Sequence, residues 1–259
     1  MHKQILAVII TLALIPSAMA AAARSHPDIR KESKREEIKS DQGEIILKVD
    51  YEYPQIINPM KDVGIENVNK ELKAYAMERY ESNMKDASQL TEEFLKNVNR
   101  SGNANRSSLL PFTMDLRYET TLDIPELVSF LWEESNYFGG AHPDTKWNGV
   151  VYDLRNGKKL EAGDILSIPE EQIKQYIAQA FQEKAKAETG MFFPEEVEKL
   201  SLLQFKYYFY LREEGMIFFL DPYQIAPYVA GRVEVILPYE KSEYYRPDIW
   251  ETLKQNGRN

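Results

Sequence analysis

The feature that most constrains the fold is a two-residue alternation of apolar and polar side chains in two separate segments. In residues 44–53 the apolar positions are Ile45, Leu47, Val49, Tyr51 and Tyr53. In residues 112–122 they are Phe112, Met114, Leu116, Tyr118 and Leu122. Because successive side chains of a strand point to opposite faces, this period predicts two strands, each with one buried face.

Two other segments have the three- and four-residue spacing of amphipathic helices. The first follows Asp62, a predicted N-cap, and its apolar positions are Ile65, Val68, Leu72, Ala76, Tyr80 and Met84. The second follows Pro169-Glu170, and its apolar positions are Ile173, Tyr176, Ile177, Ala180 and Phe181. This periodicity predicts two main helices, each with one face packed on a core.

Shorter alternating or apolar runs predict the remaining strands. They lie at 127–137, 146–154, 205–211, 216–220 and 233–237. The predicted order is therefore strand, helix, three strands, helix, three strands. Short connections favour antiparallel neighbours. We expect the α+β class, with antiparallel sheets and two main amphipathic helices packed on one face.

The N-terminus has the parts of a secretory signal peptide. A basic start at Lys3 precedes an apolar run from Ile5 to Ile15 and a small-x-small end at Ala18-Met19-Ala20. The run is too short to span a bilayer, which needs about 20 apolar residues. We predict a signal peptide over residues 1–20, no membrane span after its removal, and an exported protein that is periplasmic or extracellular.

The rest of the chain divides by composition. Between residues 24 and 39 the apolar residues are Ile29 and Ile38, which favours a flexible charged tether over 21–43. We predict a small N-terminal α+β domain over 44–125, a C-terminal α+β domain over 126–245 and a tail over 246–259.

Composition excludes several kinds of chemistry. The chain has no cysteine, so it has no disulfide, no thiolate zinc site and no cysteine nucleophile. Of three histidines, only His142 lies in the predicted fold. The formal net charge is −9, whereas binding to nucleic acid needs clustered positive charge. We expect no metal site, no cofactor and no nucleic-acid partner.

A hydrolase with two catalytic carboxylates is the enzymatic alternative. The adjacent acids Glu133-Glu134 and Glu213-Glu214 would point to opposite faces of a strand, and Asp144 would need a partner from elsewhere in the chain. We therefore predict no catalytic residues and a function other than catalysis. A peptidoglycan-active hydrolase remains as the alternative.

The most unusual local stretch is Gly139-Gly140-Ala141-His142-Pro143, which follows Phe138. Glycine permits positive φ, and proline fixes the exit from the loop. Two interpretations are open: a sharp turn in which His142 makes a local hydrogen bond, or a rigid recognition loop. Tyrosine is enriched at interfaces, so Tyr223 joins the candidates. The candidate binding residues are Phe138, Gly139, Gly140, Ala141, His142 and Tyr223.

The same stretch carries a family resemblance. Together with Gly163-Asp164-Ile165-Leu166 and the run from Phe218 to Tyr228, it resembles the C-terminal extracytoplasmic domain of RsiV, a lysozyme-sensing anti-sigma factor. The first half, with Tyr53-Pro54-Gln55-Ile56, resembles the small domain that also precedes some peptidoglycan deacetylase domains. The resemblance covers roughly residues 44 to 240.

The resemblance implies an α+β fold and a binding role. The implied partner is lysozyme or another cell-wall protein or glycan, and a structural or assembly role in the envelope is the alternative. Residues 40–259 hold 25 Lys and Arg against 37 Asp and Glu, a net charge of −12. Such a charge would speed the encounter with a basic partner.

Overall fold

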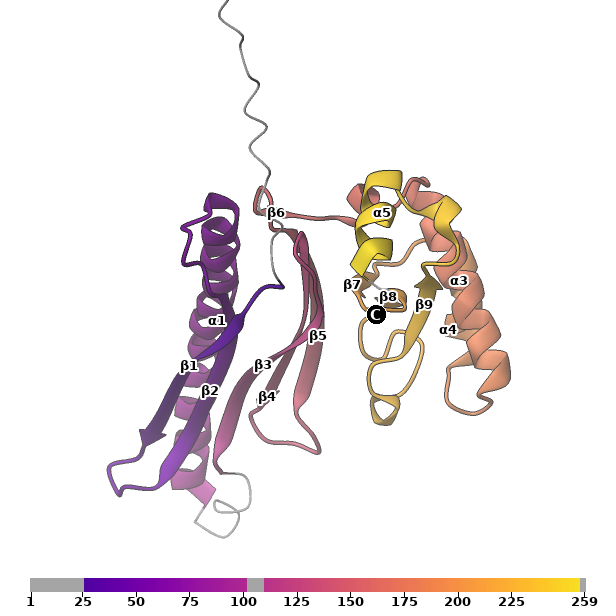
Figure 1. Cartoon of the computed structure of the whole chain (residues 1–259). Helices are drawn as coiled ribbons and strands as arrows, with labels where there is room; N and C mark the ends of the chain where they lie inside the picture. Colours follow the sequence, from indigo (N-terminus) through magenta and orange to yellow (C-terminus); the bar gives the residue numbers. More distant parts are fainter. Residues whose placement is uncertain (1–25, 102–109, 257–259) are drawn as a thin grey trace, which may run out of the picture.

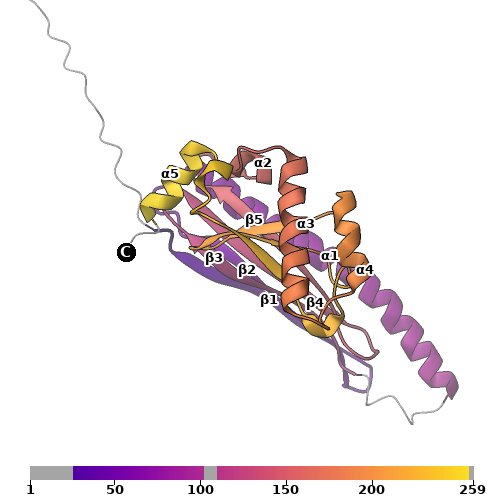
Figure 2. The ribbon, with the colours of Figure 1, turned by 90° about the vertical axis from the view of Figure 1, so that its right-hand side faces the viewer.

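The computed structural model describes residues 26–101 and 110–256, arranged in four layers (Figure 1). Helix α1 (Val63–Ser101) covers one face of a six-stranded sheet. A three-stranded sheet packs on part of the other face, and α3 (Glu170–Ala187) covers the outer side of this second sheet. Figure 2 views the molecule from the side of α3, which lies in front of the strands. The predicted signal peptide over 1–20 lies outside the described residues.

The six-stranded sheet has its strands in chain order, from β1 at one edge to β6 at the other. Its strands are β1 (Ile29–Lys39), β2 (Ile45–Ile56), β3 (Phe112–Asp123), β4 (Leu127–Tyr137), β5 (Asp144–Asp153) and β6 (Lys158–Lys159). All neighbours are antiparallel except β2 and β3, which are parallel. The long helix α1 connects these two strands and returns the chain to the starting end, as a parallel pair requires. The sheet is thus mixed rather than wholly antiparallel.

The second half of the chain builds the smaller sheet and its helices. The strands are β7 (Tyr208–Leu211), β8 (Gly215–Phe219) and β9 (Glu234–Pro238), all antiparallel. The helices beside α3 are α2 (Ala162–Ile165), α4 (Pro194–Lys199) and α5 (Pro247–Asn256). The α+β class is therefore confirmed. Within the described residues, no helix combines the length and apolarity needed to cross a bilayer.

Strand β4 lies at the centre of the molecule and is buried on both faces. Val128, Phe130 and Trp132 face α1 and belong to the core beneath that helix. Leu131, on the opposite face, contacts a second cluster that contains Tyr210 and other residues of the smaller sheet. Because both faces of β4 are buried, apolar residues follow one another in this strand without polar residues between most of them.

The two sheets approach each other closely at Gly149 on β5. A Cβ atom at this position would lie 1.9 Å from the main-chain oxygen of Phe209 on β7. Only glycine allows this distance between the two backbones. The smaller sheet is therefore seated directly on the backbone of β5.

The predicted flexible tether over 21–43 is wrong for residues 29–39, which form the edge strand β1. Its side chains pair across to β2 through charges: Lys31 Nζ lies 2.9 Å from Glu52, and Arg35 Nε lies 3.0 Å from Asp50. Backbone pairing and cross-strand ion pairs hold this strand at the edge of the sheet. Its sequence therefore has no alternation of apolar and polar residues, which is the pattern from which a strand is predicted.

Two further predicted boundaries need correction. The division at residues 125/126 falls inside the six-stranded sheet, between the adjacent antiparallel strands β3 and β4. The predicted tail over 246–259 contains helix α5, whose Ile249 and Leu253 are buried in the core of the second half. The apolar positions of α5, Ile249, Trp250 and Leu253, have the spacing of an amphipathic helix, a short signal that the prediction of a tail did not use.

Candidate functional site

The loop between β4 and β5 (residues 138–143) has the geometry that its glycines predict. Gly139 and Gly140 have φ angles of +95° and +106°, a region that other residues rarely adopt. The Tyr137 hydroxyl donates a hydrogen bond of 3.3 Å to the main-chain oxygen of Gly140. Ala141 and His142 are exposed at the tip. The loop is thus a compact turn that presents an imidazole to solvent.

The imidazole of His142 is held on both of its nitrogens. Nδ1 lies 2.8 Å from the main-chain oxygen of Pro143, and Nε2 lies 3.0 Å from the hydroxyl of Tyr223. A neutral ring with its proton on Nδ1 satisfies both contacts, since Nδ1 then donates to the carbonyl and Nε2 accepts from the phenol. The local hydrogen bond that the turn interpretation predicts is present, and so is a contact with the other candidate, Tyr223.

A second tyrosine completes this group. The ring of Tyr228 stacks on His142 with centroids 3.9 Å apart and planes 13° apart. The centroids of Tyr223 and Tyr228 are 6.0 Å apart. The Tyr228 hydroxyl also lies 3.1 Å from Oγ1 of Thr145, which is itself buried. We call His142, Tyr223 and Tyr228 the His–Tyr junction.

Tyr223 has two properties that mark it within the junction. Its φ is +64°, an uncommon and unfavourable backbone conformation for a non-glycine residue. Its side chain is nevertheless 53% exposed, so a deep hydrophobic contact does not explain the conformation. Backbone strain of this kind occurs more often at functional sites, so Tyr223 stays among the candidate residues.

Phe138 is placed differently from the other candidates. Its ring is half-buried and packs edge-on against Phe112, with centroids 6.0 Å apart. Phe138 therefore anchors the loop to the core beneath α1. The structure brings His142 and Tyr223 together and leaves Ala141 exposed next to His142, whereas the ring contact of Phe138 is with the core beneath α1.

A groove of about 560 Å³ lies beside Tyr223. Its other walls are Phe193, Pro194, Glu195 and Glu196, at the start of α4. Phe193 is 37% exposed, so the groove combines two exposed aromatic rings with two carboxylates. Phe193 and Glu195 could not be nominated from the sequence, because they lie about 30 residues from Tyr223 in the chain.

Two family models match the sequence. One, described as deacetylase PdaC, matches residues 40–145, and the other, described as a protein of unknown function (DUF3298), matches residues 163–240. The two models match successive parts of the chain, each over less than half of its length. The predicted domain pair is thereby confirmed at the level of these two families. No curated protein matches the sequence.

Solved structures show the same fold over nearly the whole chain. A member of the DUF3298 family from Bacteroides fragilis superposes with a TM-score of 0.62 at 15% identity, covering 90% of this chain and 100% of its own. A DUF3298 family protein from Pseudomonas aeruginosa PAO1 superposes with a TM-score of 0.54 at 17% identity, covering 88% and 98%. At such identities the likeness shows the fold alone.

The His–Tyr junction joins the two matched regions. His142 belongs to the PdaC match, whereas Tyr223 and Tyr228 belong to the DUF3298 match. The contact therefore depends on how the two domains pack. A partner that touches these rings would touch both domains at once.

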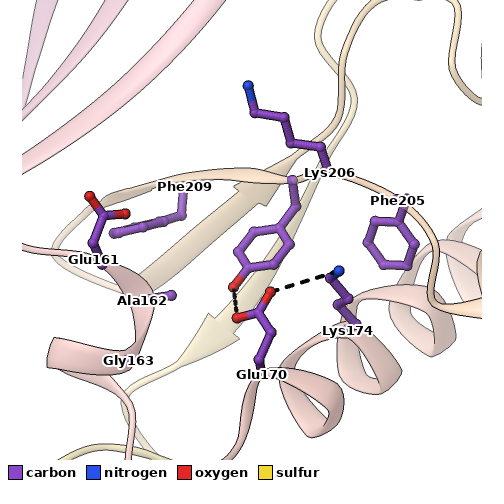
Figure 3. Close-up of a pocket in the computed structure, with 9 residues that line it drawn as sticks. Glu161, Ala162, Gly163, Glu170, Lys174, Phe205, Lys206 and Phe209 are labelled. Atoms are coloured by element: carbon purple, nitrogen blue, oxygen red, sulfur yellow. Dashed lines mark hydrogen bonds and ion pairs between the residues drawn. The ribbon is translucent and has the colours of Figure 1, made fainter.

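Another pocket, of about 410 Å³, lies within the DUF3298 half (Figure 3). Glu170 at the start of α3 accepts a hydrogen bond of 2.8 Å from the Tyr207 hydroxyl and lies 3.9 Å from Lys174 Nζ. Burial, and then the hydrogen bond to Glu170, raises the pKa of Tyr207, so its hydroxyl remains a donor. Glu161 lies on the other side of this pocket. This arrangement ties α3 to the segment before β7.

The paired acids are arranged as strand geometry predicts. Glu133 is exposed and accepts a hydrogen bond of 2.9 Å from Trp147 Nε1, whereas Glu134 is buried on the α1 side beside Arg79. Asp144 lies 3.0 Å from Lys146. Among the residues that the structure describes, no three His, Asp or Glu side chains converge to hold a metal ion.

Proposed function

We propose that this protein is an exported binding module of the cell envelope that docks a basic protein partner, with lysozyme as the first candidate. The surface that we assign to this role is the His–Tyr junction with the adjacent groove at Phe193. The observation that carries the proposal is the contact between His142 and Tyr223, two exposed side chains from different domains held at 3.0 Å.

The rigidity of the junction favours recognition. His142 is fixed by two polar contacts and a stacked ring, and Tyr228 is fixed by Thr145. Side chains that are ordered before binding lose less conformational entropy when a partner arrives. Tyrosine is also among the residues that contribute most to binding energy at protein interfaces.

The charge of the protein favours a basic partner. Residues 40–259 carry a net charge of −12, which attracts a cationic protein over a long range and raises its association rate. Glu195 places negative charge at the groove beside Tyr223, whereas the neighbouring Glu196 is paired with Lys199 Nζ at 2.6 Å. A Lys or Arg side chain in this groove would pack along the aromatic rings and reach a carboxylate.

Export and a non-enzymatic role are part of the proposal. The basic start, apolar run and small-x-small end of residues 1–20 support secretion. The resemblance to the RsiV-type domain supports a partner of the cell wall. A structural or assembly factor of the envelope, and a peptidoglycan-active hydrolase, are the competing functions.

The test is calorimetric titration of the mature protein, residues 21–259, with basic lysozymes at low and moderate salt. We expect binding that weakens as salt rises, because salt screens the attraction. Tyr223→Ala and His142→Ala should each weaken it about tenfold or more, a loss of roughly 1.4 kcal/mol. No binding to any lysozyme at low salt would contradict lysozyme as the partner.

The matched control is Met60→Ala. Met60 is 88% exposed and lies in the turn between β2 and α1. This turn is at the end of the sheet opposite the β4–β5 loop (Figure 1). An equal loss of binding in this variant would contradict the assigned surface. Release of soluble fragments from peptidoglycan by the mature protein would favour the hydrolase instead.

A further inference from the structure

Strand β1 has an open outer edge. It ends the six-stranded sheet at the side opposite to β6, and among the described residues β2 is the one strand that pairs with it (Figure 1). The main-chain oxygen of Asp28, just before β1, accepts a hydrogen bond of 2.8 Å from the N–H of Ile57, just after β2. Because the direction of the backbone groups alternates along an antiparallel strand, those of the odd-numbered residues from Ile29 to Glu37 point away from β2. Strand β1 thus presents a row of N–H and C=O groups that a further strand could pair with.

The usual ways of shielding such an edge are absent from β1. Sheets protect an edge by keeping its strand short, by a proline or a bulge, or by covering it. Strand β1 is 11 residues long, has no proline, and keeps a regular register with β2 as far as the irregularity at Ile38/Lys39. It is rich in charged residues, which can also repel another strand. The order of these charges therefore decides whether a second strand is repelled or accepted.

The charges on one face of β1 alternate in sign. Glu36 accepts a hydrogen bond of 2.6 Å from the hydroxyl of Tyr80, and Lys34 Nζ lies 4.1 Å from the centroid of the same ring, so this row of side chains faces α1. With its period of two, the row continues through Glu32 and Arg30. Its members pair along the strand, Arg30 with Glu32 at 2.7 Å and Lys34 with Glu36 at 2.9 Å. The row thus reads positive, negative, positive, negative.

This order is self-complementary in an antiparallel pair of β1 strands. When a two-fold axis passes through Ser33, Arg30 of each copy lies opposite Glu36 of the other, and Glu32 lies opposite Lys34. A slip of two residues in one direction places Glu32 opposite Glu36, and a slip in the other direction places it opposite its own copy. Opposite charges across a strand pair stabilise it and like charges destabilise it, so the charges select one register.

The other face of β1 tolerates this register. It places Lys31 opposite Arg35, which are both cations, but each of them already has a carboxylate of β2 as its partner. Lys31 Nζ lies 2.9 Å from Glu52, and Arg35 Nε lies 3.0 Å from Asp50. These ion pairs reduce the repulsion between the two cations.

We infer that β1 is a self-association edge, through which two copies of this protein pair antiparallel with Ser33 on the two-fold axis. The two sheets then become continuous, and the outward N–H and C=O groups of both strands are satisfied. The same surface is used on both copies, so the assembly closes as a dimer. The net charge of −12 over residues 40–259 opposes association, and we expect a weak dimer.

The inference goes beyond the proposed function and does not depend on it. Strands β2 and β3 separate β1 from β4 and from the β4–β5 loop that carries His142. Each copy of the dimer therefore keeps its His–Tyr junction free. Titration with lysozyme tests the junction, and the oligomeric state tests the edge.

The experiment is sedimentation velocity of the mature protein over a range of concentrations. We expect a monomer–dimer equilibrium with a dissociation constant of about 100 µM or below. Two variants each give the row a single sign: Arg30→Glu with Lys34→Glu, and Glu32→Lys with Glu36→Lys. Each alone should dimerise at least about tenfold more weakly than the parent, and an equimolar mixture of the two should associate again because their rows are complementary.

The matched control is Lys70→Glu with Lys73→Glu, which makes the same change in net charge at two exposed residues of α1 and should dimerise as the parent does. A readout on the parent needs no substitution: the N–H of Ser33 should exchange with solvent more slowly as the protein concentration rises. A parent that stays monomeric at about 300 µM would overturn the inference. So would a dimer that persists in both single-sign variants, or a mixture of the two that does not associate.

Discussion

The side-chain oxygen of Ser129 on β4 accepts a hydrogen bond of 2.9 Å from the main-chain N–H of Leu211 on β7. Both residues have 0% exposure. Ser129 also accepts a hydrogen bond of 2.9 Å from the hydroxyl of Thr121 on β3. Because β4 belongs to the PdaC-type region and β7 to the DUF3298 region, this serine is a polar link between the two domains.

Replacing Ser129 with Ala should destabilise the whole protein. The N–H of Leu211 would be left buried without an acceptor, which costs about 1–3 kcal/mol in the free energy of unfolding. Urea unfolding measures this change. The control is Ser88→Ala, an exposed serine that bonds its own helix at Met84, and its effect should stay within about 0.5 kcal/mol. Equal effects of the two substitutions would contradict the role of Ser129.

Gly149→Ala should disrupt the contact between the two sheets. Its Cβ would lie 1.9 Å from the main-chain oxygen of Phe209, and a backbone atom cannot move aside as a side chain can. We expect a loss of about 3 kcal/mol or more in the free energy of unfolding. Gly163→Ala is the matched control, since no atom lies within 4 Å of its Cβ, and in helix α2 alanine should be neutral or stabilising. A small effect at Gly149 would mean that the sheets separate easily.

The fold class and most strands could be predicted because they depend on local periodicity. Strand β1 could not be predicted in this way. Its charged side chains pair with Asp50 and Glu52 of β2, about 15 to 21 positions away in the chain, and the spacing of apolar residues gives no sign of such contacts. The parallel pairing of β2 and β3 depends on where the long helix α1 returns the chain. Such pairings are set by tertiary packing and not by local sequence.

The candidate site shows the same limit. Local sequence could nominate His142, from its glycine-rich loop, and Tyr223, as a tyrosine in the resembling segment. Their contact joins residues 81 positions apart and exists only because the smaller sheet packs on β5.

Strand β1 gives a prediction on truncation. A chain that begins at Ser40 should be less stable than one that begins at Arg24, by at least about 3 kcal/mol, because several backbone hydrogen bonds worth roughly 1 kcal/mol each are lost. The exposed edge of β2 should also promote aggregation. Urea unfolding and size-exclusion chromatography measure both effects. Identical unfolding curves would favour the tether over the strand.

Asp164 gives a prediction on pH. The hydrogen bond from Lys158 Nζ, and then that from the N–H of Glu161, lowers the pKa of this carboxyl below its ordinary 3.8. A lowered pKa stabilises the folded state above the pKa of the unfolded chain, and the effect is lost as pH falls through the folded value. Asp164→Asn should therefore cost about 0.5–1 kcal/mol near neutral pH, a figure that allows for solvent screening.

The difference between the parent and Asp164→Asn should shrink as pH falls below about 4, and urea unfolding across this range measures it. Asp41→Asn, in the exposed turn between β1 and β2, is the control and should show no such convergence. A difference that stays constant down to acid pH would mean that the carboxylate charge of Asp164 has no role.

Tyr223 gives the sharpest test of strain at the candidate site, because its φ of +64° reverses the usual ranking of small residues. Alanine normally stabilises a position relative to glycine by about 0.5–1 kcal/mol. In the left-handed region a side chain with Cβ loses roughly 1–2 kcal/mol, a penalty that glycine does not have. Tyr223→Gly should therefore be as stable as Tyr223→Ala or more stable, by up to about 1 kcal/mol, while both lose the hydroxyl contact to His142 and bind the partner weakly. Thermal and urea unfolding of the two variants measures the ranking. If Tyr223→Ala proves clearly more stable than Tyr223→Gly, the backbone at Tyr223 is not strained. Strain then no longer supports a functional role for this exposed side chain.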